Sequence, residues 1–292
     1  MPSISITEGY TFTNLGPLTT TFTAPTSCAT VTDNYQLGFN TTAPAWDYAI
    51  QCTTAGYGGC IPSGTVSDLI TSNDNPKTIN TQAYLSPGLY CPSGWTTRGV
   101  AVRNANSSLS SSGILSSSTT MSIPTFVPQW NNPATLLMDL LDPSETLVMC
   151  CPESMTADLA MGCYSTVSDY KITEGCMRVL PVTDVGTSTE TIIVDGSTST
   201  QLNYVITGTQ PIATTTRTFS PSEASELIAV SVLPMLSLVH HQSDLPVATS
   251  SKTASPTSSA ARVAPHANVW SGLGGFHCEC YFPVMGVYKY TE

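Results

Sequence analysis

Residues 145–165, ETLVMCCPESMTADLAMGCYS, contain the features that decide the fold class. The apolar run from Thr146 to Cys151 predicts a strand that ends at the Cys151-Pro152 pair. The last two residues of this strand, Cys150 and Cys151, are adjacent in the chain. Because a disulfide between sequence neighbours is strained, we expect the two cysteines to bond to different partners. The stretch therefore predicts strands held by disulfides.

The ten cysteines form two groups of four and a pair near the end of the chain. None of the spacings makes a CxxC pair and no histidine lies near the first eight, so zinc binding is poorly supported. Eight cysteines in a chain rich in serine and threonine are typical of four disulfides in an oxidising compartment, with buried free thiols as the alternative. Their pairing stays open at this stage. The candidates are Cys28, Cys52, Cys60, Cys91, Cys150, Cys151, Cys163 and Cys176.

The charge of the chain excludes several partners. It has 292 residues with 9 Lys and Arg against 20 Asp and Glu, a formal charge of -11, and only 10% charged residues. So few cations cannot form the basic surface that nucleic acids or anionic lipids require. With 41% hydrophobic residues the chain can still bury a sizeable core.

Several segments predict a mainly β fold with one or two short helices. Residues 187–219 alternate in polarity around a turn at Asp195-Gly196, which suggests a hairpin pairing 191–194 with 200–205. Residues 5–23 suit strands broken at Gly16-Pro17, and residues 99–103 suit another. Residues 133–141 predict a short helix that ends before Asp142-Pro143.

A second helix is predicted to begin near residue 220. Ser220 can cap it, Pro221 suits the first helical position, and Glu223 has the capping-box spacing. The apolar run 227–239 follows, and we expect it to continue as a buried helix kinked at Pro234. Thirteen residues are too few to cross a membrane, which takes about twenty, although association with a membrane stays open.

Composition divides the chain into three parts. Residues 1–246 form a β-rich, disulfide-bonded ectodomain, in which the Ser-rich stretch 107–120 is a surface loop or a linker between two subdomains. Residues 247–268 read as a disordered Ser/Thr/Pro stalk, and residues 269–292 as a tail of different composition. The start of the chain, residues 1–28, has no basic segment followed by an apolar run, so it does not indicate how export begins.

The sequence assigns no catalytic residue, cofactor or metal site. His240, His241 and Asp244 could bind a metal or serve as a base, but two polar residues at the end of an apolar helix explain them better. The motif His277-Cys278-Glu279-Cys280 has soft ligands but too few at useful spacings, so a disulfide or an incidental sequence is favoured.

Two alternatives involve carbohydrate. A hydrolase could use paired carboxylates, for example from Asp139, Asp142 and Glu145, although a turn-capping role explains these residues as well. A carbohydrate-binding module could stack a cell-wall polysaccharide on tryptophans, although large rings more often supply core area. The stacking candidates are Trp46, Trp95 and Trp130.

Glycosylation would supply the solvation that charged residues normally provide. Two N-glycosylation sequons occur, at Asn40 and Asn106, and the second adjoins the Ser-rich stretch. The Ser/Thr residues next to proline in 249–259 suit O-glycosylation.

Three segments carry a resemblance to known proteins: 10–28 (YTFTNLGPLTTTFTAPTSC), 84–95 (YLSPGLYCPSGW) and 145–165. They resemble a group of cell-surface proteins of filamentous ascomycete fungi. The resemblance implies an ectodomain on a stalk, held at the membrane by an apolar segment or a lipid anchor, and it implies no activity. Residues 260–275 resemble the lead-in to such an anchor, but residues 276–292 depart from it, and we hypothesise that the native anchor is replaced here.

The expected function is therefore that of a non-catalytic fungal glycoprotein, extracellular or at the cell surface, with a wall-structural, adhesive or sensing role.

Overall fold

The computed structural model describes residues 4–7, 10–30, 35–39, 46–52, 56–70, 81–116, 132–159, 161–179, 184–194, 197–206 and 213–245. All of them belong to one compact unit. The predicted stalk at 247–268 and the tail at 269–292, with Cys278 and Cys280, lie outside these residues. The described part is mainly β with short helices and disulfides, which confirms the predicted fold class.

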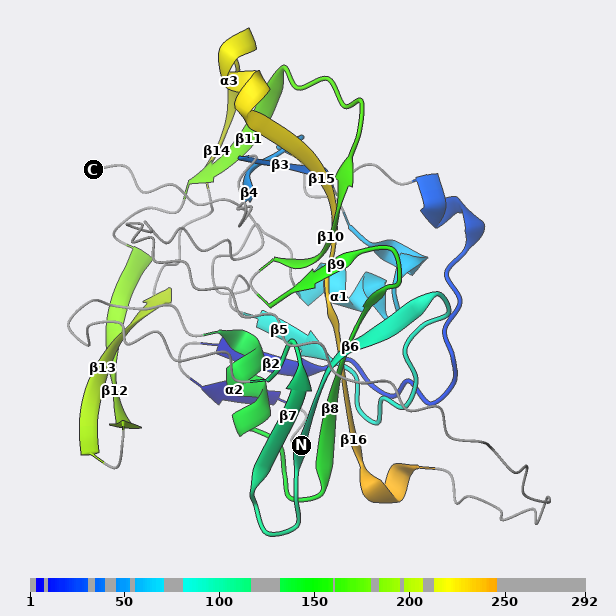
Figure 1. The fold of residues 1–292 in the computed structure, drawn as a ribbon, viewed down its shortest axis with the longest axis vertical. Coiled ribbons are helices and arrows are strands. Elements are labelled where there is room, and N and C mark those ends of the chain that lie inside the picture. Colours follow the sequence, from blue (N-terminus) through cyan, green and yellow to red (C-terminus); the bar gives the residue numbers. More distant parts are fainter. Residues whose placement is uncertain are drawn as a thin grey trace, which may run out of the picture. The chain divides into compact units, whose positions relative to one another are not determined.

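Two of the sheets meet through one strand pair (Figure 1). A three-stranded sheet has the order β1 (Ile4–Thr7), β2 (Tyr10–Asn14), β5 (Thr81–Tyr84). A four-stranded antiparallel sheet has the order β16 (Leu236–His241), β8 (Glu145–Pro152), β6 (Trp95–Arg103), β7 (Leu109–Gly113). Leu85, just after β5, forms a parallel bridge to Leu238 of β16 and so joins the two sheets.

A seven-stranded antiparallel sheet contains most of the remaining strands. Its order is β14 (Ala213–Thr218), β11 (Glu174–Val179), β4 (Trp46–Ala49), β3 (Tyr35–Phe39), β15 (Leu227–Leu233), β10 (Gly162–Val167), β9 (Thr156–Asp158). A separate hairpin pairs β12 (Val185–Val194) with β13 (Ser197–Ile206). The predicted hairpin is confirmed, but the predicted pairing of 191–194 with 200–205 is wrong: residues 191–194 pair with 197–200, from Thr191 opposite Thr200 to Val194 opposite Ser197, because the strands pair right up to the turn.

The prediction of a long kinked helix after residue 220 is wrong. The helix α3 (Pro221–Glu226) begins as predicted, with Ser220 accepting from the Glu223 N–H and Glu223 completing the capping box, but it ends at Glu226. The apolar run then forms β15 and β16, separated by Pro234 and Met235 (Figure 1). A short apolar run suits a buried strand as well as a helix, and its valines and isoleucine favour the strand where partners exist on both sides.

The other helices are short. The predicted helix at 133–141 is confirmed as α2 (Pro133–Asp139), capped by Asn132, whose side chain accepts from the Ala134 N–H. The sequence did not predict α1 (Gly64–Ile70). Within the described residues, 3₁₀ turns include η1 (Thr26–Thr30), η2 (Gly58–Cys60) and η5 (Gln242–Asp244).

Part of the Ser-rich stretch 107–120 also differs from the expected loop or linker. Leu109 to Gly113 forms β7, which pairs along its whole length with β6, from Arg103 opposite Leu109 to Gly99 opposite Gly113. Gly113 has a φ of 64°, and a Cβ there would collide with the Arg98 carbonyl. Only glycine therefore lets the chain turn this close to β6.

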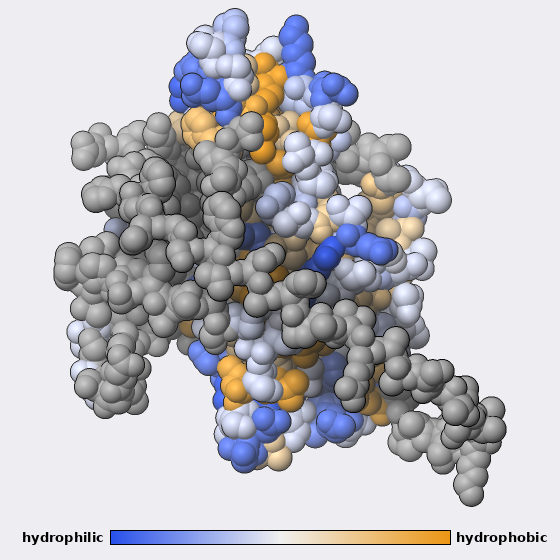
Figure 2. All heavy atoms as spheres, in the orientation of Figure 1, coloured by the Kyte–Doolittle hydropathy of each residue, from blue (hydrophilic) through white to orange (hydrophobic). Residues whose placement is uncertain are grey.

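The main hydrophobic core lies between the joined sheets and α2. It contains rings from β2 and β5, aliphatic residues from β6, β8 and β16, and the apolar face of α2. Among its members Phe12, Tyr84, Leu147 and Val239 are almost fully buried. On the face seen in Figure 2, apolar residues surface in several separate places among hydrophilic and near-neutral ones.

Four disulfides tie the described strands and loops together, as the sequence predicted. They are Cys28–Cys60, Cys52–Cys176, Cys91–Cys150 and Cys151–Cys163. The adjacent Cys150 and Cys151 bond to different partners, which confirms that expectation. Successive side chains of a strand point to opposite faces, so β8 is fastened on both of its faces.

The disulfides are expected to differ in how much they stabilise the fold. Cys52–Cys176 spans 124 residues of sequence and Cys28–Cys60 spans 32. Replacing either pair by alanine should lower the free energy of unfolding by about 2–5 kcal/mol, with about 1 kcal/mol more lost for Cys52–Cys176, because the longer loop has more entropy when open. Urea unfolding of both double variants measures this. Equal losses, or a larger loss for Cys28–Cys60, would contradict the prediction.

Candidate functional site

A small pocket lies where β5 and β16 separate. The strands touch at Leu85, whose N–H donates to the Ser237 carbonyl and whose carbonyl accepts from the Val239 N–H, each at 2.9 Å. On the N-terminal side of Leu85, β5 pairs in parallel with β2. On the N-terminal side of β16 the chain contains Pro234, which has no backbone N–H to donate to a neighbouring strand. The two strands therefore diverge, and the pocket occupies the fork between them.

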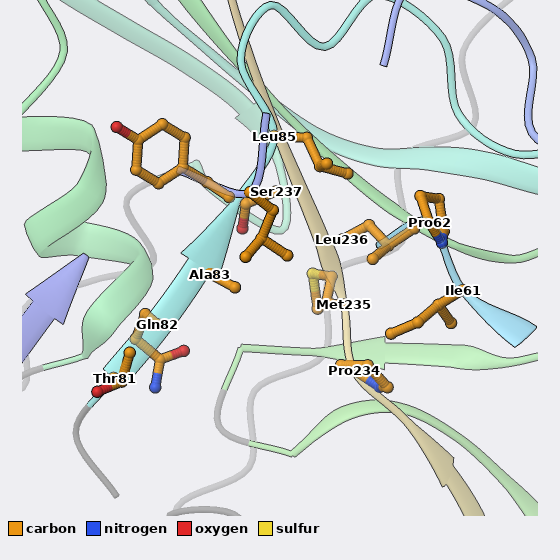
Figure 3. A pocket seen from close by; sticks show the side chains of 12 residues that line it. Ile61, Pro62, Thr81, Gln82, Ala83, Leu85, Pro234, Met235, Leu236 and Ser237 are labelled. Carbon is orange, nitrogen blue, oxygen red and sulfur yellow. The ribbon is translucent and has the colours of Figure 1, made fainter. Parts of the chain in front are cut away.

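The pocket has a predominantly apolar lining. Residues of β5 lie along one side, Pro234 to Leu236 lie opposite, and Ile61 and Pro62 close a third side (Figure 3). Its cavity volume is about 60 Å³, whereas small-molecule sites usually measure roughly 300–1,000 Å³. The described residues that line it are Leu15, Ile61, Pro62, Thr81, Gln82, Ala83, Tyr84, Leu85, Pro234, Met235, Leu236 and Ser237. There is no carboxylate or tryptophan among these described lining residues.

The candidate carboxylates serve the turn that precedes β8. Glu145 is 5% exposed, and its Oε2 accepts from the Asp142 N–H at 2.8 Å, while its own N–H donates to the Asp142 carbonyl at 3.0 Å. Asp139 is exposed and lies 3.9 Å from the Arg103 guanidinium. Burial, with the negative charges of Glu145 and Asp142 adding to it, raises the pKa of Tyr84 to about 12, so this phenol stays protonated. The geometry favours the turn-capping interpretation of these acids.

The rings of the adjacent histidines His240 and His241 bond to different partners and do not share a ligand position. The Nδ1 of His240, a buried side chain on β16, lies 3.0 Å from the Gly88 carbonyl. A carbonyl only accepts, so this nitrogen carries the proton. The Nδ1 of His241 accepts from the Ser243 N–H at 3.1 Å and is therefore unprotonated, and the His241 N–H donates to Asp244 at 2.8 Å. These residues end β16 and begin η5, so the prediction that they end a helix is wrong. Their bonds hold the end of the strand and cap the 3₁₀ turn.

Of the three candidate tryptophans, one has a described side chain. Trp95 is partly buried at the start of β6, where it packs against two clusters, one around Cys150 and one around Cys151 and Cys163. Its contacts are those of a core residue. The side chain of Trp46 and all of Trp130 lie outside the described residues, so the predicted stacking face stays a prediction.

The Asn106 sequon lies at the exposed tip of the β6–β7 hairpin. The Oδ1 of Asn106 accepts from the Ser108 hydroxyl at 2.7 Å and from the Ser108 N–H at 3.1 Å. Asn104 Nδ2 donates to the same hydroxyl at 2.9 Å, and Arg103 donates to the Ser107 carbonyl at 3.1 Å. The acceptor asparagine is thus presented on a tied turn. Asn40 lies outside the described residues.

Three arginines hold the structure together instead of facing a ligand, a role that the sequence analysis did not foresee. Arg98, the extra residue of a bulge in β6, donates to the carbonyls of Pro152, Glu153 and Met155 at 2.8–3.2 Å. Arg103 donates to the carbonyls of Met138 and Asp139 as well as Ser107. No motif in the sequence indicated these contacts, because the partner carbonyls of Arg98 lie more than 50 residues away along the chain.

The third arginine anchors α3 to the seven-stranded sheet. Arg217 pairs with Glu223 at 2.7 Å and donates to the Tyr48 hydroxyl at 2.8 Å, with its guanidinium 5.6 Å from the Phe219 ring centre. Hydrogen bonds from the Ser220 backbone and hydroxyl, and then from Arg217, lower the pKa of Glu223 to about 2. Arg217 and Glu223 therefore form a charged clamp at the end of β14.

The described ranges hold neither a cluster of metal ligands nor a membrane-spanning helix. No group of three or more His, Cys, Asp or Glu residues is arranged there to hold a metal ion. In the same part of the chain, no helix has both the length and the apolar character needed to cross a membrane. The His277-Cys278-Glu279-Cys280 motif falls outside it.

The comparisons with known proteins give no relative. No family model matches the chain, and neither a curated protein nor a solved structure matches it. The inferences about function therefore depend on the chain's own geometry.

The core interpretation of Trp95 can be tested against the stacking interpretation. Trp95→Ala should lower the free energy of unfolding by about 3 kcal/mol, as expected for a packed aromatic residue. The matched control Tyr90→Ala removes an exposed ring, 43% accessible, and should change it by less than about 0.5 kcal/mol. Chemical denaturation measures both. A stable Trp95→Ala protein that has lost binding to chitin or β-glucan would establish stacking instead.

The Glu223 clamp makes the anchoring of α3 sensitive to acid. The folded pKa is about 2, lowered from 4.5, so the stabilisation is complete above about pH 4.5 and disappears as the pH falls toward 2. Glu223→Gln should remove this part of the acid dependence. The measurement is the denaturation midpoint of both proteins between pH 2 and pH 6. If the two midpoints fall in parallel over that range, the clamp does not act as described.

Proposed function

We propose that the chain is the β-rich ectodomain of a secreted or cell-surface fungal glycoprotein that has no catalytic activity and acts through its surface, in a wall-structural, adhesive or sensing role. The observation that carries the proposal is the pairing of eight cysteines in four disulfides. Disulfides form and persist in oxidising environments and are rare in the cytosol. The resemblance of residues 10–28, 84–95 and 145–165 to fungal cell-surface proteins supports the same location.

The charge distribution supports an exposed, glycosylated surface. Only 10% of the residues are charged, and Arg98, Arg103 and Arg217 are engaged with carbonyls, a phenol or a carboxylate. Charged residues normally keep a surface soluble. Here exposed hydroxyls and attached sugars are proposed to take over that role.

The site geometry supports a function without catalysis. The described carboxylates near β8 cap a turn, and the fork pocket has about 60 Å³ and no acidic residue in its lining. A glycosidase needs two carboxyl groups facing a sugar across a cleft. The proposal therefore places function on the outer surface of the sheets.

The location and redox state can be tested together on the full chain secreted by a filamentous fungus. A thiol-alkylating reagent applied without reduction should leave the eight cysteines unlabelled, and reduction should expose all of them. Recovery of the chain in the culture medium or the wall fraction supports the proposal. A cytosolic protein with eight labelled cysteines would overturn it.

Asn106 is predicted to carry an N-linked glycan. Its side chain is exposed at a hairpin tip, and the Ser108 hydroxyl that completes the sequon contacts its carboxamide oxygen. Asn106→Gln should abolish the glycan at this tip, while Ser110→Ala, which removes an exposed hydroxyl outside the sequon, should leave it. Glycopeptide mass spectrometry of the secreted variants measures site occupancy. An unmodified Asn106 in the wild-type protein would contradict the prediction.

A further inference from the structure

Strand β7 is an exposed sheet edge that lacks the usual protection. Its five residues, LSSSG, contain no charge and no proline. Four of them are exposed, including Leu109 at 39%, and Ser111 is partly buried. One edge pairs with β6. At the other edge the Gly113 carbonyl accepts from the Ser116 N–H at 3.1 Å, and within the described residues no backbone bond reaches the outward groups of Leu109 and Ser111. Such an edge offers a row of backbone N–H and C=O groups to any strand that can reach it.

Three other edge strands of the described sheets are protected. The opposite edge of this sheet, β16, is partly covered, because Val239 donates to the Leu85 carbonyl and Gly88 donates to the Val239 carbonyl. In the seven-stranded sheet, the outer strand β14 contains Arg217 and the outer strand β9 contains Asp158. Charged residues on edge strands are a common defence against pairing between molecules. β7 lacks both cover and charge.

The Asn106 side chain lies beside the start of this unprotected edge. Asn106 precedes β7 by three residues, and its carboxamide oxygen is held by Ser108, the residue just before the strand. Its Nδ2, to which a sugar would attach, makes no hydrogen bond within the described residues. Arg103 fixes the turn to α2 through the carbonyls of Ser107 and Met138. The base of a glycan would therefore be held in a fixed position at the β7 side of the tip.

We propose that an N-linked glycan on Asn106 shields the edge of β7 and prevents it from pairing with a second copy of this chain. The inference rests on the proposed glycosylation of Asn106 and adds a role for it. A five-residue strand is about 17 Å long, and a branched glycan of several hexose rings attached at one end is long enough to lie over it. The sugar would prevent pairing with another chain, as a lysine or a proline does on the edge strands of other proteins.

The unshielded edge fits a second copy because it is self-complementary. An antiparallel pair of two β7 strands about a two-fold axis sets Ser111 opposite Ser111 and Leu109 opposite Gly113. No like charges meet in this arrangement, and small hydroxyls impose no steric barrier. The shielded protein is therefore a monomer, and removal of the sugar allows the pairing.

The test measures the mass of the secreted full-length chain in solution by light scattering after gel filtration. The wild-type protein and Ser110→Ala, which keep the sequon, should be monomeric. Asn106→Gln and Ser108→Ala, which remove the sequon in two different ways, should double in mass. Adding Ser112→Lys to Asn106→Gln places a charge on the edge and should restore the monomer.

Glycopeptide mass spectrometry on the same samples separates the two proposals. If Asn106 carries a glycan and both sequon variants stay monomeric at high concentration, the shielding role is overturned while the glycosylation stands. If wild-type Asn106 carries no glycan, the glycosylation proposal is overturned and shielding with it. A dimer of Asn106→Gln that persists with Ser112→Lys shows association through another surface, which also overturns shielding of β7.

Discussion

The alternation of side chains along strand β8 is the constraint on which the rest of the structure depends. Cys150 and Cys151 are neighbours in sequence, so they point to opposite faces of the strand and bond to Cys91 and Cys163. The second of these partners lies on β10, in the seven-stranded sheet, while β8 lies in the four-stranded one. Strand β8 is therefore linked by one disulfide to Cys91, in the segment before β6, and by another to the seven-stranded sheet. Trp95 packs against the clusters around both links.

A second connection between the same sheets comes from the chain itself. The apolar run from Leu227 passes along the seven-stranded sheet as β15, turns at Pro234, and continues as β16 at the edge of the four-stranded sheet. Leu85 then bonds to β16 and brings in the strands at the start of the chain. The small pocket at this junction is the space left where two strands diverge. It is a consequence of the connection, and its size does not suit a substrate.

The low charge content acquires a structural meaning once the contacts are known. Each of three arginines organises several carbonyls or a carboxylate, so these cations are used within the framework. With few charges, the surface depends more on serine, threonine and the proposed glycans. The edge strand β7 shows the cost, because an edge without charges has fewer means of preventing strand pairing between molecules. A glycan at the tip of the hairpin would supply the missing protection.

The sequence by itself determined the fold class and the four disulfides, which follow from composition and cysteine number. It also determined the separate partners of Cys150 and Cys151, the capping box at Ser220 and the hairpin around residue 195, which follow from local geometry and spacing. The tertiary structure decided what local patterns leave open. The run 227–239 is mostly apolar, interrupted by Ser231, Pro234 and Ser237, and such a short run suits a buried helix or a buried strand. Only the strands on both sides of β15 decided between them. The Ser-rich segment became β7 because β6 offered a free edge. Which cysteines pair, and which carbonyls Arg98 and Arg103 hold, depend on contacts between residues distant in sequence, and no local pattern encodes them.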